Sequence, residues 1–200
     1  MVAVSVLIPS LTERLSVAGA LLSKLHAQAA ALPQDVQAEV ICITDNRKLP
    51  LSLKRNAMMR LATGSFIVHL DDDDDVADDF LSEVCTAVLA HPTVDVICYN
   101  QLAYLNDDPP FRVSTSLSFD NEEIAKVSKE HTDGAVWKDI KRKPWHWCAW
   151  ASRLTSTEFD EGYGEDWRWL LDVLPKAATE HRIDKVLHTY RWSKVATTFN

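Results

Sequence analysis

The sequence predicts an α/β protein, organised as a three-layer α/β/α sandwich around a mainly parallel central sheet. Short apolar segments rich in β-branched residues recur in the first half of the chain, at 4–8, 39–44, 66–70 and 94–99. Stretches with apolar residues at helical spacing separate these segments. Each apolar segment is continuous instead of alternating, which is typical of parallel strands buried on both faces.

The first half of the chain alternates between strands and helices. After the strand at 4–8, apolar residues recur at helical spacing until Pro33 interrupts the pattern. The strand at 39–44 precedes a helix over 50–63, which Gly64 is expected to end. Strands joined in this way form right-handed βαβ units, so a parallel sheet with helices on both faces follows.

Five consecutive aspartates at 71–75 directly follow the predicted strand at 66–70. Two like charges about 4 Å apart repel by about 1 kcal/mol even in water, so a fold that keeps five together is expected to supply a cation. Carboxylate oxygens at a strand end suit Mg²⁺ or Mn²⁺ holding a phosphorylated ligand. The alternative is a solvated acidic turn before a helix at 80–89 that Asp78 and Asp79 would cap.

Polar residues follow the strands predicted at 4–8, 39–44 and 66–70. Ser10, Asp45 and the aspartates at 71–75 come directly after them. The carboxyl ends of parallel strands meet at one edge of a sheet, where ligands of such sheets bind. The sequence therefore predicts that these side chains converge on a nucleotide-type ligand.

The pattern changes after Asn100. Residues 111–119 alternate, which predicts a hairpin or a strand that crosses the sheet. The charged, weakly periodic segment 121–134 is expected to form a flap, and 144–150 a strand. Further on, the sequence predicts a helix over 165–174, with an acidic pair at its start, and a last strand at 183–188. All seven tryptophans lie in the final 64 residues.

Composition narrows the class of protein. With 200 residues and 46% apolar content the chain can form a substantial core. The net charge is −8, but 71–79 alone contains seven acids, so the acidity is local and neither favours nor excludes a nucleic-acid partner. The four cysteines show no pairing or metal-binding spacing and are expected to be free thiols. Without a signal sequence or an 18-residue apolar run, we expect a cytoplasmic protein that does not bind membranes.

Five pieces of the chain, in this order, resemble the GT-A fold glycosyltransferases, in particular the large family-two group that uses nucleotide-diphosphate sugars. They are 4–9, Lys54-Arg-Asn56 with Ala62-x-Gly64, 66–74 in the place of the family's Asp-x-Asp strand end, Glu165-Asp166, and Tyr190-Arg191. The resemblance implies one GT-A-like domain over 1–200 with a Rossmann-like sheet. Residues 1–100 would form its nucleotide-sugar-binding half and 101–200 its acceptor-side half.

The resemblance also implies roles for single residues. Those expected at the nucleotide or donor are Pro9, Ser10, Glu13, Asp45, Arg55, Asn56, Asp71 and Asp72. Those expected at the metal are Asp73 and Asp71, with His188 as a further ligand, and a shift of register within the run would substitute Asp72 and Asp74. Those expected at the acceptor are Trp145, Trp150, Tyr190 and Arg191. Asp166 resembles the general base, beside Glu165. The family's usual pair of acids after the second strand reads Thr44-Asp45 here, which leaves the nucleobase open.

Structural alternatives exist for most of these residues. Ser10-x-x-Glu13 fits a capping box. Arg55 and Asn56 fit an exposed helix face, and Glu165 and Asp166 fit helix-capping acids. The remaining alternatives are a structural role for His188 and core positions for Trp147 and Trp169.

The predicted function is metal-dependent transfer of a sugar from a nucleotide-diphosphate donor to an acceptor hydroxyl, with inversion, and with Mn²⁺ or Mg²⁺ as cofactor. A saccharide, a protein side chain or a hydroxylated DNA base are all open as acceptors. One alternative is a nucleotidyltransferase, although the segment 9–14 lacks the glycine-rich phosphate loop of that class. Another is a non-catalytic acidic scaffold that binds a metal or a partner, although five adjacent aspartates do not match the spacing of a calcium loop.

Overall fold

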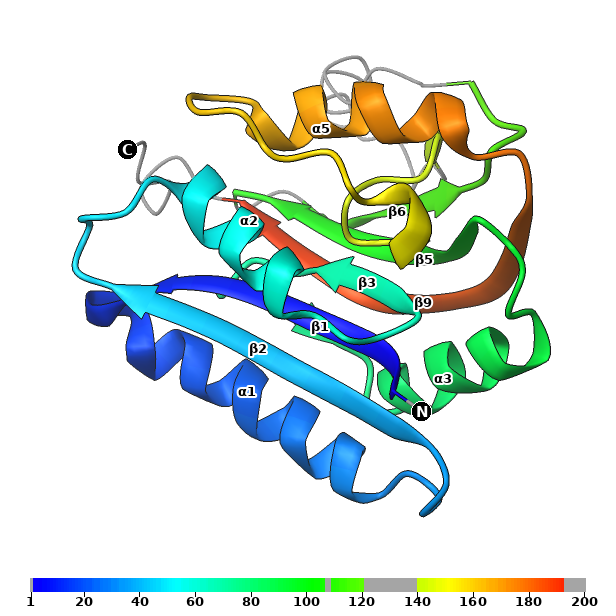
Figure 1. The fold of residues 1–200 in the computed structure, drawn as a ribbon, viewed down its shortest axis with the longest axis horizontal. Coiled ribbons are helices and arrows are strands. Elements are labelled where there is room, and N and C mark those ends of the chain that lie inside the picture. Colours follow the sequence, from blue (N-terminus) through cyan, green and yellow to red (C-terminus); the bar gives the residue numbers. More distant parts are fainter. Residues whose placement is uncertain (1, 107–108, 121–139, 193–200) are drawn as a thin grey trace.

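The computed structural model describes residues 2–106, 109–120 and 140–192. The strands in these ranges form one mixed sheet (Figure 1). They are β1 (Val2–Leu11), β2 (Gln37–Asp45), β3 (Phe66–His69), β4 (Asp75–Val76), β5 (Val96–Leu105), β6 (Phe111–Thr115), β7 (Ile140–Arg142), β8 (Ala149–Ala151) and β9 (Glu180–Trp192). Their order is β2-β1-β3-β8-β5-β6-β7, while β9 pairs with β5 over much of its length and with β4.

The parallel part of the sheet is built as the sequence predicts. β1 lies between β2 and β3 and is parallel to both, and β9 is parallel to β5. β8 lies between β3 and β5 and is antiparallel to both. The α/β class with a central sheet is confirmed. β8 joins the parallel strands β2-β1-β3 to the parallel pair β5 and β9, and β6 and β7 form a further parallel pair.

Helices cover both faces of the sheet, which confirms the three layers. α1 (Leu15–Ala30) and α3 (Phe80–Ala90) lie on one face, and α2 (Leu51–Leu61) and α5 (Glu165–Val173) lie on the other (Figure 1). Short 3-10 helices occupy Thr12–Arg14, Ser152–Leu154 and Leu174–Lys176. In the described ranges, no helix combines the length and the apolar character needed to cross a membrane.

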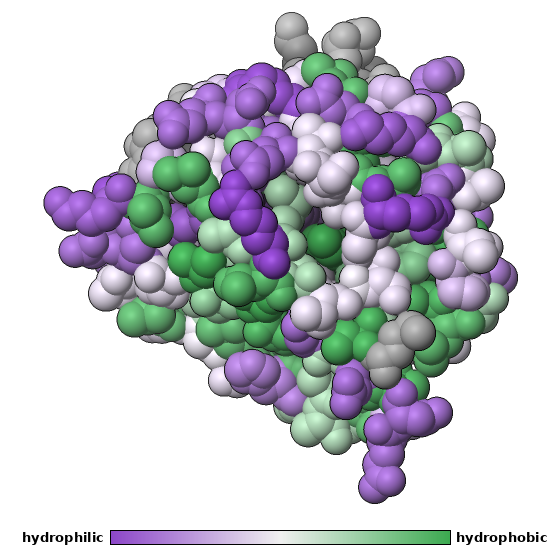
Figure 2. Space-filling view, viewed as in Figure 1, coloured by the Kyte–Doolittle hydropathy of each residue, from purple (hydrophilic) through white to green (hydrophobic). Residues whose placement is uncertain are grey.

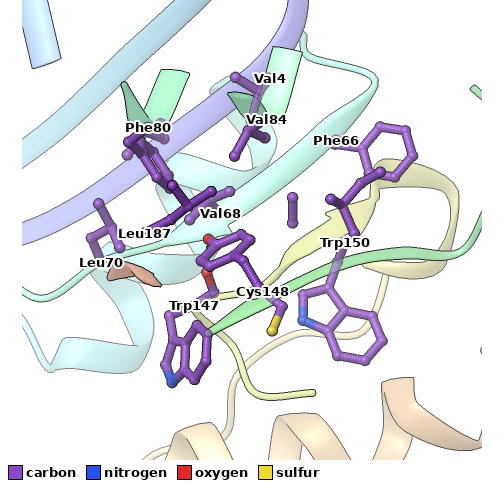
Figure 3. Close-up of a cluster of buried hydrophobic side chains, with 14 of the residues drawn as sticks. Val4, Phe66, Val68, Leu70, Phe80, Val84, Trp147, Cys148, Trp150 and Leu187 are labelled. Carbon is purple, nitrogen blue, oxygen red and sulfur yellow. The ribbon is translucent and has the colours of Figure 1, made fainter. Parts of the chain in front are cut away.

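The hydrophobic core lies on both faces of β1, because successive side chains of a strand point to opposite sides. Val4 and Val6 belong to the large cluster that includes Phe80 of α3, whereas Leu7 packs with Met58 of α2. Figure 3 shows part of the large cluster. This two-sided burial is the physical reason for the continuous apolar sequence of β1.

The surface outside this core is mixed in character. Figure 2 shows hydrophilic side chains spread over the visible face, with smaller hydrophobic groups between them. Two large aromatic side chains remain exposed beside the start of α5, those of Tyr163 and Trp167. All four cysteines are free, as expected.

Gly64 has a different role from the expected one. The residue that ends α2 is Ala62, which is extended, so no left-handed glycine ends the helix. Instead, Gly64 lies directly against β1. A Cβ atom at this position would lie 2.5 Å from the Ser5 hydroxyl and 2.8 Å from the carbonyl carbon of Val4. A glycine is therefore required because the backbone passes this close to the neighbouring strand.

Elements of the second half differ in extent from the predictions. The predicted strand at 144–150 is limited to β8, because a turn closed by the Cys148 amide and the Trp145 carbonyl (2.9 Å) precedes it. β9 is longer than the predicted strand at 183–188. The alternating segment at 111–119 contains β6, which is antiparallel to β5, as a hairpin requires. The segment predicted as a flap, 121–134, falls entirely outside the described residues.

Candidate active site

The ends of β1, β2 and β3 meet at one edge of the sheet, as the sequence predicts, and Lys54 of α2 joins two of them. Its ammonium group lies 2.8 Å from the Ser10 carbonyl and 2.6 Å from the Asp45 carboxylate. Asp45 also accepts a hydrogen bond from the Leu49 amide (2.7 Å). The hydrogen bond from Lys54 and those from the loop lower the pKa of Asp45 to about 2. Asp45 thus holds the loop after β2 in place.

The five aspartates alternate between inside and outside. Asp72 and Asp74 are buried, whereas the side chains of Asp71 and Asp73 are 37% and 36% exposed. Side-chain cations face four of them, and the imidazole of His188 faces the fifth, Asp74. The pairs are Arg55 with Asp71 (2.8 Å), Arg14 with Asp72 and Asp73 (both 2.7 Å), His188 with Asp74 (2.9 Å) and Lys24 with Asp75 (3.1 Å). The mutual repulsion of the aspartates is therefore compensated by the protein itself.

Asp71 and Asp73 fit a divalent cation better than their neighbours do. Both line the same open cavity, and Mg²⁺ in proteins is often held by only one or two carboxylates together with phosphate oxygens and water. Within the described residues, no group of three or more potential protein ligands converges on a metal position. A cation at this edge would thus need oxygens from its substrate.

The carboxylates of Asp72 and Asp74 face the protein interior. Asp72 accepts a hydrogen bond from the Ser10 hydroxyl (2.7 Å), and burial raises the pKa of its carboxyl. Burial likewise raises the pKa of Asp74 to about 6, although His188 opposes the shift. One Asp74 oxygen, Oδ1, has no hydrogen-bond partner among the described residues. A shifted metal register would have to break these interior contacts.

His188 is engaged on both sides of its ring. Nε2 lies 2.9 Å from the Asp74 carboxylate, and Nδ1 lies 3.0 Å from the side-chain amide nitrogen of Gln101. The ring also stacks on Trp147. A role as a metal ligand would require one of the two nitrogen contacts to break. The arrangement matches the structural alternative for this histidine.

Arg55 lies at the centre of the site. Its side chain is only 2% exposed, so the alternative of an exposed helix face is wrong. Besides Asp71, the guanidinium contacts Glu165 at 3.6 Å and lies over the ring of Phe159. Its Nε and Nη1 groups make no hydrogen bond to any described residue. Arg55 therefore connects the end of β3 to the start of α5.

The acidic pair begins α5 after a loop with two left-handed glycines, Gly162 and Gly164. Glu165 is mostly buried, and burial raises the pKa of its carboxyl although Arg55 opposes the shift. Asp166 is more exposed and lies 3.5 Å from Nδ1 of His146. Burial lowers the pKa of His146 to about 3, so this imidazole is neutral at pH 7. Asp166 is thus a carboxylate beside a neutral ring.

Two cavities meet at Asp166. The larger, of about 1250 Å³, extends from the ends of β1 and β2 to the start of α5. The smaller, of about 210 Å³, lies beside β5, β6 and β9. Four residues line both cavities, namely Asp71, Trp145, Asp166 and Tyr190. Among the other predicted site residues, those that line the larger cavity are Pro9, Ser10, Arg55, Asp72, Asp73, Glu165 and Arg191.

Four expected site residues line neither cavity, namely Glu13, Asp45, Asn56 and Trp150. Trp150 is fully buried and belongs to the cluster of Figure 3. Its ring packs edge-on against Trp169, a position that favours a structural role over the expected acceptor contact. Asn56 is buried too, and its amide exchanges two hydrogen bonds with the backbone of Phe159 (3.0 and 2.7 Å). Both side chains therefore have structural roles.

Glu13 is exposed and pairs with Arg47 (3.0 Å). Arg47 lines the larger cavity, whereas Glu13 does not. The capping box is wrong as well, because Ser10 bonds to Asp72 and the residue that precedes the short helix, Leu11, forms no side-chain cap. The alternative role for the acids after the aspartate run was to cap the helix that follows, α3. Asp79 precedes α3 but forms no side-chain cap there.

Four residues of the site were missed from the sequence: Arg14, Lys54, Arg142 and His146. Lys54 precedes Arg55 on the helix that follows the second strand, so a basic pair near the strand ends was a usable signal. Arg14 follows the first strand in the same way. Arg142 lies in the basic run Lys141-Arg-Lys143 next to Trp145, which was a usable local signal. His146 carries none, because its partner Asp166 lies 20 residues further along the chain.

The fold is shared with solved structures of S. aureus TarS. For full-length TarS the TM-score is 0.63 at 13% identity, over 95% of this chain and 37% of that chain. For TarS 1–349 in complex with UDP-GlcNAc the TM-score is 0.62 at 16% identity, over 95% of this chain and 58% of that chain. For TarS 1–349 in complex with UDP the TM-score is 0.65 at 14% identity, over 96% of this chain and 61% of that chain. The chain therefore shares its fold with TarS.

This likeness is one of fold. The chain spans between 37% and 61% of the length of these TarS chains. No family model and no curated protein sequence matches it.

Proposed function

We propose that the protein transfers a sugar from a nucleotide-diphosphate donor to an acceptor hydroxyl, with inversion, and that Asp166 is the general base. The observation that carries this proposal is the position of Asp166 at the junction of the two cavities. A donor in the larger cavity and an acceptor in the smaller one would meet at this carboxylate.

The larger cavity has the charge distribution that a diphosphate needs. Arg14, Arg47, Lys48 and Arg191 all contribute to its lining. Guanidinium groups bind phosphate oxygens through paired hydrogen bonds. The complexes of S. aureus TarS with UDP-GlcNAc and with UDP support a donor of this class.

Asp71 and Asp73 would hold the divalent cation. A bound Mg²⁺ or Mn²⁺ supplies positive charge that stabilises the leaving diphosphate. Arg14 contacts both Asp72 and Asp73 (2.7 Å each) and so holds these side chains at the edge of the larger cavity. Arg55 fixes Asp71 from the interior.

Asp166 would accept the proton of the acceptor hydroxyl as the oxygen attacks the anomeric carbon. Its neighbour His146 is neutral at pH 7, so no opposite charge at that contact competes for the carboxylate. Glu165 is held by Arg55 and fixes the start of α5. Attack from the acceptor side, opposite the departing diphosphate, inverts the anomeric configuration.

Thermal denaturation with UDP, in the presence and absence of Mn²⁺, tests the donor site. A ligand at 100 times its Kd stabilises the native state by about 2.7 kcal/mol. We expect a Mn²⁺-dependent rise in Tm that Asp73→Ala abolishes. Asp166→Asn should keep this rise but lose transfer from a panel of UDP-sugars. Asp172→Asn, an exposed acid on the same helix, is the matched control for both measurements.

Two results would contradict the proposal. Turnover that persists in Asp166→Asn would remove this residue as the base. A UDP-induced rise in Tm that is the same without Mn²⁺, and unchanged in Asp73→Ala, would remove the cation from the donor site.

A further inference from the structure

The smaller cavity is narrow and largely aromatic. Its walls include Phe111, Trp145, Trp147 and Tyr190. At about 210 Å³ it holds a small group only, whereas the neighbouring cavity is about 1250 Å³. Flat apolar walls favour the C–H faces of a compact ligand.

One cation points into this aromatic cavity. Arg142, the last residue of β7, lines it, and its guanidinium lies 3.9 Å from the centre of the Trp145 ring. Within the described residues, no carboxylate forms an ion pair with Arg142, although Arg14 and Arg55 both have one. Burial lowers the pKa of Arg142 to about 10. A desolvated charge without a counter-ion is unfavourable, and an anionic ligand would relieve that cost.

The guanidinium is held in place before any ligand arrives. The ring of Trp145 also stacks with that of Trp167, with 5.3 Å between ring centres. The Trp145 carbonyl accepts a hydrogen bond from the indole nitrogen of Trp150 (2.8 Å). Arg142 therefore rests on an aromatic stack fixed to the core, and a fixed cation loses little freedom on binding.

The acids of this cavity differ in their pairing. Asp71 and Asp74 already face Arg55 and His188. Asp166 faces a neutral imidazole and is close enough to raise the pKa of Arg142. As far as the described residues go, the cavity thus presents one unpaired cation and one unpaired carboxylate to the same ligand.

We propose that the smaller cavity is the acceptor subsite and takes a small hydroxyl-bearing anion. Its phosphate or carboxylate group binds Arg142, and its hydroxyl group lies toward Asp166. This inference rests on the proposed function. In the transfer step the acceptor oxygen bonds to the anomeric carbon, the bond from that carbon to the diphosphate oxygen breaks, and the hydroxyl proton passes to Asp166.

Titrations that follow tryptophan fluorescence test the subsite, because Trp145 and Trp147 line it. The probes are inorganic phosphate, glycerate and glycerol, added to the unsubstituted protein, Arg142→Gln, Arg142→Lys and Lys141→Gln. A lost charge-assisted hydrogen bond weakens binding by about tenfold or more. We expect this loss in Arg142→Gln for phosphate or glycerate and a smaller loss in Arg142→Lys. The matched control Lys141→Gln should bind like the unsubstituted protein.

Phosphate and glycerate distinguish the two kinds of anionic group, because the anion with the lower Kd identifies the acceptor as a phosphate or a carboxylate. Equal binding by Arg142→Gln and the unsubstituted protein would overturn the subsite, as would glycerol binding as tightly as either anion. Ala103→Val narrows the same cavity without changing a charge, so it should weaken anion binding even if Arg142→Gln does not fold. A UDP titration of the same variants tests the donor site independently of the subsite. If none of them bound UDP, the result would count against the donor proposal only.

Discussion

Arg55 holds two acidic segments of the site at once. Its guanidinium bonds to Asp71 at the end of β3 and contacts Glu165 at the start of α5. Two of its nitrogen groups have no hydrogen-bond partner in the part of the chain that the structure describes. Because Arg55 is buried and contacts both segments, it fixes the distance between the candidate metal ligand Asp71 and the start of α5, where the candidate base Asp166 lies. Arg55 is thus a positioning residue for both.

Replacing Arg55 is expected to lower stability as well as activity. Arg55→Gln leaves Asp71 and Glu165 without their shared cation, and removing one partner of a partly buried ion pair costs about 2–4 kcal/mol. Urea denaturation measures this free energy of unfolding. The control Arg60→Gln lies on the exposed side of α2 and should change it by less than about 0.5 kcal/mol. A loss in Arg55→Gln no larger than that of the control would contradict the bridging role.

The sequence indicated which residue types gather at the site but not which of them face the ligand. The run Lys54-Arg-Asn56 resembles a donor motif, and all three side chains are buried. Asn56 is buried because of the backbone of Phe159, 103 residues away. Contacts of this kind have no local pattern, so the roles of Asn56 and Trp150 were not predictable from periodicity.

At the scale of elements, the close passage of Gly64 beside β1 determines how the connection from α2 enters β3. The Gly64 amide also donates to the Ser5 hydroxyl (2.8 Å). That hydroxyl donates to Glu39 of β2 (2.6 Å). The entry to β3, the strand that precedes the aspartates, is therefore tied to β1 directly and to β2 through Ser5.

Gly64→Ala should destabilise the protein by about 1–3 kcal/mol, because the new methyl group would overlap the backbone of Val4 and Ser5. Gly19→Ala is the matched control, since a Cβ at Gly19 in α1 meets nothing within 4 Å. That substitution should instead raise the free energy of unfolding by about 0.5–1 kcal/mol through helix propensity. Thermal denaturation of both variants measures the two changes in stability. If Gly64→Ala and Gly19→Ala changed the free energy of unfolding by the same amount and with the same sign, the close-contact role of Gly64 would be contradicted.

The first half of the fold was predictable because its strands are continuous apolar segments separated by helices. The placement of β8 was not. Its three residues, Ala149–Ala151, lie antiparallel between β3 and β5, and both partner strands are more than forty residues away in sequence. Local propensity describes an element, whereas the choice of a distant partner depends on the packing of the whole chain.

At the scale of the whole molecule, Asp95 joins three parts of the sheet. It lies just before β5 and accepts hydrogen bonds from the Ala178 and Thr179 amides before β9 (2.8 and 2.9 Å). It also accepts one from Arg153 after β8 (2.6 Å). Burial alone would raise the pKa of Asp95, but the hydrogen bonds from the backbone and from Thr179 outweigh it and lower the pKa.

This lowered pKa gives stability a defined dependence on pH. The contribution of Asp95 is fully present above the pKa of about 4 that the residue has in the unfolded chain, and it is lost as pH falls through the lower native value. Asp95→Ala should lower stability by about 2–3 kcal/mol at pH 7. Its difference from the unsubstituted protein should shrink below about pH 4 in urea denaturation. A difference that grows on acidification would contradict this account. Asp35→Ala removes an exposed acid and is the control for a general loss of negative charge.

The wall that the two cavities share has a practical consequence for inhibitor design. Asp71, Trp145, Asp166 and Tyr190 are the points at which a molecule could pass from one cavity to the other. A bisubstrate compound that joins a nucleoside diphosphate to a small acidic tail through a short linker would occupy both sides at once. Its affinity would exceed that of either fragment because the second contact forms within one complex, so such a compound would serve as a selective chemical probe for this protein.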